Sequence, residues 1–139
     1  MRVPYRTNPG PNNTVLYHPL VRVRVGKKRG PPTRFFEAMV DSGAADCMFP
    51  ATIAEAIGIH DITTGRKDER LGIGGPEDVW LHPIVLYVGE HVLNIEAAFS
   101  RTLPVAGLLG RRGFFEHFKI TFDPTSDPPG LEIERAYKA

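Results

Sequence analysis

Short segments of the chain alternate apolar with polar residues, which is the pattern of strands that bury one face. Valine alternates with arginine over residues 21–25, and a similar alternation covers residues 92–99. The chain has 14 glycines and 13 prolines, which interrupt it often, as turns do in all-β folds. The pattern therefore predicts a mainly β fold, closed or sandwich-like. Further strands are expected over residues 35–40, 80–88, 120–122 and 131–133.

Helical spacing occurs in two places. Pro50 suits the first turn of a helix, apolar residues follow at helical intervals over residues 53–57, and Gly58 is a suitable stop. Residues 111–118 predict a second short helix that buries three phenylalanines.

The length of 139 residues suits one domain. Residues 1–13 are rich in proline, asparagine and glycine and show no strand pattern, so they predict a flexible N-terminal arm, with an arm held by a partner as the alternative. Residues 14–139 then form a single domain. No apolar run predicts an export signal or a membrane span, and we expect a cytoplasmic protein without a membrane partner.

Composition excludes several kinds of site. The net charge of +1 gives no whole-chain reason to expect nucleic acid. The single cysteine, Cys47, excludes an internal disulfide and a cysteine-built zinc site. The five histidines form no close-spaced ligand motif, so neither a metal nor another cofactor is expected. Cys47 itself is interpreted as a small buried residue, with a reactive thiol as the alternative.

Asp41 is the strongest candidate for chemistry, because it directly follows an apolar strand and carboxylates are rarely buried without a purpose or a partner. Ser42 supplies a hydroxyl, and Gly43 lets a backbone approach closely. Taken alone, this tripeptide is also compatible with a turn that caps the following helix.

The wider pattern resembles the retropepsin-like aspartic proteases. Residues 41–44 (Asp-Ser-Gly-Ala) resemble the active-site signature of that family, and a short helix follows. A glycine-rich hairpin tip at residues 72–75 is similar to the family's flap, and residues 108–111 (Leu-Leu-Gly-Arg) are similar to its second motif. The resemblance covers residues 34–122. It implies a closed β-barrel, the half of an acid protease, with one or two short helices and a flap hairpin.

The resemblance also implies an aspartic endopeptidase, a hydrolase that activates one water between two carboxylates. Two close carboxylates share a proton because both cannot ionise cheaply. One chain carries only one signature, so a homodimer would bring Asp41 and its symmetry mate together. The catalytic residues implied are Asp41, Ser42 and Gly43. The implied partners are a second copy of the chain and a peptide or protein substrate.

Substrate would lie extended between the signature loop and the flap, where glycines allow the hairpin to open and close. A mobile surface turn is the alternative for the glycine-rich tip, whereas a phosphate-binding loop is disfavoured because no Gly-Lys-Ser/Thr follows. Gly110 would allow close packing near the Asp41 loop, and Arg111 would anchor that loop and the dimer. The implied substrate-binding residues are Ala44, Ala45, Asp46, Gly72, Ile73, Gly74 and Gly75.

The chain departs from the family pattern in ways that matter. Ala45 stands where family members often carry an aspartate, so the partner of Arg111 is open, and Arg112 is interpreted as a solvated charge. Ala44 has no hydroxyl to donate to the carboxylate, so we expect activity at mildly acidic to near-neutral pH. The missing N-terminal strand pattern is consistent with a weak dimer. A catalytically inactive peptide-binding or dimerisation module is the alternative function.

Overall fold

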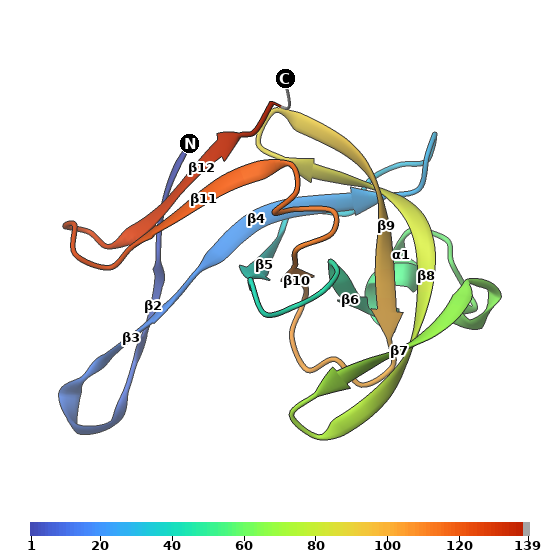
Figure 1. Cartoon of the computed structure of the whole chain (residues 1–139), viewed down its shortest axis with the longest axis horizontal. Helices are drawn as coiled ribbons and strands as arrows, with labels where there is room; N and C mark the ends of the chain where they lie inside the picture. Colours follow the sequence, from blue (N-terminus) through green and yellow to red (C-terminus); the bar gives the residue numbers. More distant parts are fainter. Residues whose placement is uncertain (138–139) are drawn as a thin grey trace.

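The computed structural model describes residues 1–137. Most of these residues lie in strands, and the helical segments are short (Figure 1). The strands are β1 (Arg2–Pro4), β2 (Arg6–Pro9), β3 (Val15–His18), β4 (Leu20–Gly26), β5 (Phe36–Val40), β6 (Met48–Pro50), β7 (Arg66–Gly72), β8 (Gly75–Val88), β9 (His91–Ser100), β10 (Leu108–Leu109), β11 (Phe118–Asp123) and β12 (Gly130–Arg135). The helices are α1 (Ala51–Ala56) and two 3-10 turns, η1 (Pro11–Asn13) and η2 (Ile62–Thr64).

Six strands close into a barrel in the order β4-β5-β10-β6-β9-β8, and the pairing of β4 with β8 completes the circle. Strand β8 makes this closure possible because its 14 residues are long enough to pair with β9, β4 and β7. Its early residues pair with β7 in a hairpin that extends beyond the barrel (Figure 1). The predicted mainly β, closed fold with a short helix is confirmed.

The barrel encloses an apolar core that follows the alternation in the sequence. Val21, Val23 and Val25 are at most 2% exposed, whereas the intervening Arg22 is exposed. This difference is what a strand with one buried face requires. The largest fully buried side chains include Phe49, Phe99, Phe114, Phe118, Leu86 and Leu109.

A mixed arrangement of three short strands positions the candidate site. Strand β10 runs parallel to β5 and antiparallel to β6. Leu109 is therefore beside Val40, the last residue before Asp41. Because β10 runs parallel to β5, both strands end at the same edge of the sheet, so the loops that follow β5 and β10 lie side by side.

The expectation that residues 1–13 lack strands is wrong. Strand β1 pairs with β12, and β12 pairs with β11 in a separate three-stranded sheet. The sequence hid β1 because it is only three residues long, has no apolar alternation and ends at a proline. The expected mobility of residues 1–13 stays a prediction.

The helix expected over residues 111–118 is also wrong, because residues 111–117 form turns with one isolated bridge at Arg112, and Phe118 begins β11. Gly113 adopts a positive φ of 93°, which interrupts a right-handed helix. The N–H groups of Arg111 and Arg112 donate instead to the carbonyls of Ala44 and Ala45. The phenylalanines in this segment still enter the core, so the burial pattern was right while the element was not.

The remaining helical expectations hold. Helix α1 follows Pro50 and ends before Gly58, which has a φ of 88°. Among the described residues, no helix has the length and apolar character needed to cross a membrane.

Candidate active site

Asp41 is held in a tight turn at the end of β5. Its backbone N–H donates to the carbonyl oxygen of Leu109 at 3.0 Å. Its carboxylate oxygen Oδ1 accepts from the N–H of Gly43 at 2.9 Å. The side chain is half-buried. The turn does not cap α1, because β6 intervenes and Pro50 occupies the cap position. The Asp41 carboxylate therefore has no helix-capping role.

Residues 110–112 clamp the Asp41 turn from the neighbouring strand. The N–H of Arg111 donates to the carbonyl of Ala44, and its guanidinium Nη1 donates to the carbonyl of Ser42 at 2.8 Å. A Cβ on Gly110 would overlap the carbonyl of Asp46 and come within 2.7 Å of the Ala44 carbonyl oxygen. Glycine is therefore required for this close approach. The contact of Arg111 with the loop is present, and its role in a dimer stays a prediction.

The glycine-rich tip forms the turn of the β7–β8 hairpin. Gly72 pairs with Gly75, so Ile73 and Gly74 make a two-residue turn. Gly75 has a φ of 104°, a conformation that favours glycine. Leu71 and Ile73 are strongly exposed, with exposed fractions of 83% and 111%. The hairpin predicted at residues 72–75 is present, and its motion over a substrate stays a prediction.

Comparison with solved structures identifies the fold that carries this site. A retropepsin-like aspartic protease from Rickettsia conorii is similar over 95% of this chain and 98% of its own, with a TM-score of 0.65 and 18% identity. The EIAV protease in complex with the inhibitor HBY-793 is similar over 68% of this chain and 82% of its own, with a TM-score of 0.53 and 18% identity. This chain has the retropepsin-like fold. No protein-family model and no curated protein sequence matches the chain.

Within this retropepsin-like fold, Asp46 connects the signature loop to the hairpin. Asp46 is 2% exposed, and its Oδ2 accepts from Nε of Arg70 on β7 at 2.6 Å. Its Oδ1 lies 2.9 Å from Nη2 of Arg112. Arg70 also pairs with Asp68 at 2.8 Å. The hydrogen bond to Asp46, followed by the hydrogen bond to Asp68, raises the pKa of Arg70, so its guanidinium stays charged.

The ion pair corrects the interpretation of Arg112 as a solvated charge: its side chain is 61% exposed yet pairs with Asp46. Sequence reasoning missed the two ion pairs of Asp46 because Arg70, Asp46 and Arg112 are far apart in the chain. The available signal was a carboxylate within the otherwise apolar stretch 44–49, which requires a cation once buried. With both oxygens occupied by arginines, Asp46 faces the protein interior, which disfavours the expected substrate contact.

Cys47 is buried, which agrees with its interpretation as a small buried residue and not with a reactive thiol. It is 0% exposed and unpaired with another cysteine. Burial raises the pKa of its thiol from 9.0 to about 12, against an opposing hydrogen bond from the Gly110 backbone. At neutral pH the thiol is protonated and is not a nucleophile.

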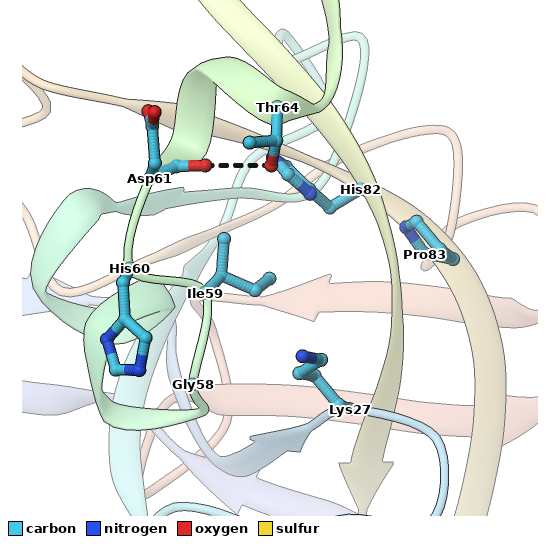
Figure 2. Close-up of a pocket in the computed structure, with 8 residues that line it drawn as sticks. All are labelled: Lys27, Gly58, Ile59, His60, Asp61, Thr64, His82 and Pro83. Carbon is cyan, nitrogen blue, oxygen red and sulfur yellow. Dashed lines mark hydrogen bonds between the residues drawn. The ribbon is translucent and has the colours of Figure 1, made fainter.

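Two cavities of similar volume differ in their position relative to the candidate site. A groove of about 280 Å³ lies beside the strands that lead to Asp41, and it is lined by Asn8, His18, Leu20, Glu37, Met39, Val105, Ala106 and Gly107. Figure 2 shows a second cavity of about 270 Å³, lined by residues outside the candidate site. Two of its polar side chains bond to backbone carbonyls: His82 donates to the Ile62 carbonyl at 2.7 Å, and Thr64 donates to the Asp61 carbonyl at 2.8 Å. Among the described residues, no cluster of three His, Cys, Asp or Glu side chains could hold a metal ion.

Proposed function

We propose that the chain is an aspartic endopeptidase that hydrolyses extended peptide segments. The observation that carries this proposal is the Asp41-Ser42-Gly43 turn, clamped by residues 110–112 beside a glycine-tipped hairpin. The carboxylate is half-buried and forms no ion pair within residues 1–137. A carboxylate fixed by backbone contacts and left without a cation is suited to proton transfer.

One chain supplies one half of the catalytic pair. A second copy related by a two-fold axis would place its own Asp41 opposite the first, because such an axis repeats the same loop on both sides. The two carboxylates would then share one proton, since two adjacent negative charges repel. In this arrangement the Ser42 loops meet at the axis, and the protein is its own partner.

The reaction follows from this shared proton. The ionised carboxylate takes a proton from water as the water oxygen attacks the peptide carbonyl carbon. The protonated carboxylate gives its proton to the carbonyl oxygen, which forms a tetrahedral diol. The carbon–nitrogen bond then breaks as the leaving nitrogen takes the proton from one carboxylate, and the other carboxylate takes a proton from a diol hydroxyl, which leaves a free carboxyl group. The dyad returns to its starting protonation.

We further propose that the substrate lies extended between the signature loop and the hairpin. The backbone of Gly43, Ala44 and Ala45 borders one side of this path, and residues 72–75 border the other. An added strand binds mainly through backbone hydrogen bonds, which suits a glycine-rich partner. Closure of the hairpin would exclude water other than the attacking molecule.

Digestion of a diverse peptide mixture tests the proposal. We expect cleavage by the wild-type chain at high protein concentration between about pH 4 and 7.5, read by mass spectrometry. Asp41→Asn should abolish cleavage, because an amide cannot take the proton from water. Asp78→Asn, an exposed carboxylate on β8 paired with Lys67 at 3.6 Å, is the matched control and should cleave normally. Cleavage by Asp41→Asn would exclude the dyad, and a dimer that cleaves nothing would favour a binding module.

A further inference from the structure

The hairpin formed by β2 and β3 projects from the body of the molecule (Figure 1, blue). Its two strands pair with each other and with no other strand in the described part of the chain. All four residues of β2 are exposed, and Val15, Leu16 and Tyr17 of β3 are 51%, 45% and 50% exposed. A two-stranded hairpin is marginally stable by itself in water, so this one needs additional contacts.

The hairpin also lacks the charges that protect free strand edges. Residues 7–17 contain no Asp, Glu, Lys or Arg, although charged residues make up 24% of the chain. Free edge strands in monomers usually carry charged side chains that prevent pairing with other molecules. Interface centres instead are poor in charge and rich in tyrosine. The composition of this hairpin is therefore that of an interface.

The base of the hairpin is fixed beside the candidate site. The N–H of Val40, the residue before Asp41, donates to the carbonyl of Pro19 at 2.9 Å. Arg6 pairs with Glu37 on β5 at 3.1 Å. The groove of about 280 Å³ described above runs between this base and β5. The exposed hairpin and the Asp41 loop are thus held to the same strand.

We propose that the β2–β3 hairpin is an arm that packs against a second copy of this chain. The inference rests on the proposed function, in which Asp41 needs a symmetry mate. A two-fold axis at the Asp41 loops brings the second copy next to the base of the arm. The reason is that Val40, the residue directly before Asp41, bonds to Pro19 at that base. The uncharged edge of β3 and its three apolar side chains then bury against the partner.

Sedimentation equilibrium tests the arm. Leu16→Ser combined with Tyr17→Ser removes two exposed apolar side chains, so the fold of each chain should persist, as circular dichroism can verify. We expect the dissociation constant of the dimer to rise about tenfold or more, given the contribution of two buried side chains of this size. The matched control is Val92→Ser, on β9, whose side chain is 60% exposed. An equal dissociation constant in wild type and double variant overturns the proposal.

Hydrogen exchange gives a second measurement that needs no substitution. The amides on the free edge of β3 should exchange more slowly as the wild-type concentration rises from below to above the dissociation constant. Unchanged exchange over residues 15–18 across a range in which the dimer forms would contradict the arm.

The two proposals fail differently. A dimer that weakens in the double variant but cleaves no peptide supports the arm and overturns the endopeptidase. A dimer that cleaves peptide and is unaffected by the double variant supports the endopeptidase and overturns the arm. A chain that stays monomeric at every concentration overturns the arm and the shared dyad, and cleavage by that monomer would show that the reaction uses another site.

Discussion

At the scale of single residues, Asp46 decides how the signature loop and the hairpin are held together. It is a buried anion between two cations, Arg70 from β7 and Arg112, which directly follows the second motif. Breaking such a pair costs more than the pair itself contributes, because the remaining charges lose their partner where water is scarce. Sequence reasoning assigned Asp46 to substrate binding and could not identify its partners, since a long-range ion pair leaves no local pattern.

Asp46→Asn should therefore destabilise the fold. Asparagine can still accept a hydrogen bond from Arg70 but no longer balances its charge. Arg112 is largely exposed and Arg70 is 18% exposed, so water compensates in part. We expect the free energy of unfolding to fall by about 1–3 kcal/mol, measured by urea denaturation.

The control for this substitution is Asp78→Asn, which breaks the exposed pair with Lys67. Exposed pairs contribute about 0–1 kcal/mol, so the change should be small. Equal losses in the two variants would show that the Asp46 bridge adds nothing beyond an ordinary surface pair.

At the scale of elements, the two-residue strand β10 is the most demanding part of the site. It fits between β5 and β6, and Gly110 directly after it leaves no space for a side chain. Gly110→Ala should lower the free energy of unfolding by about 1–3 kcal/mol through overpacking, and it should displace the Asp41 turn. Thermal unfolding measures the first effect, and loss of peptide cleavage in the remaining folded protein measures the second.

Gly74→Ala is the matched control, because a Cβ at the hairpin tip meets no atom within 4 Å. Its stability should remain within about 0.5 kcal/mol of wild type. A Gly110→Ala variant as stable as Gly74→Ala would mean that the loop around Asp46 can move aside.

The elements differ in how well their sequences predicted them. Long strands such as β8 and β9 were identifiable because burial of one face imposes alternation over many residues. Residues 111–118 misled because apolar spacing reports burial and not backbone conformation, and the N–H groups of Arg111 and Arg112 pair with the Asp41 loop. Strand β1 was missed because its partner, β12, lies more than 120 residues away along the chain.

At the scale of the whole molecule, the order of the motifs was enough to predict the barrel. The surface through which two copies would assemble could not be predicted from the sequence. Four weak local signals in one order restrict the topology strongly, because each must occupy a set place in the same fold. The interface has no such constraint. The composition of the β2–β3 hairpin predicted only an arm. The structure adds that no other strand within residues 1–137 pairs with this hairpin and that its apolar side chains are exposed.

Acid stability is a property of the whole molecule that the structure also predicts. Three exposed aspartates have pKa values lowered from 3.8: Asp61 by the hydroxyl and N–H of Thr63, Asp68 by hydrogen bonds from Arg70, and Asp123 by those from Thr125. The unfolded chain therefore binds protons at a higher pH than the folded chain does. Their contribution to stability is complete above the ordinary pKa and is lost as the pH falls through the lowered values.

We expect the urea midpoint to hold steady above about pH 5 and to fall progressively below about pH 4. Asp61→Asn, Asp68→Asn and Asp123→Asn combined should flatten this fall, because the groups that take up protons on unfolding are gone. An equally steep fall in the triple variant would assign acid sensitivity to other carboxylates. Comparison of the cleavage profiles of the wild type and the triple variant below about pH 4 then separates the effect of lost stability from protonation of the dyad.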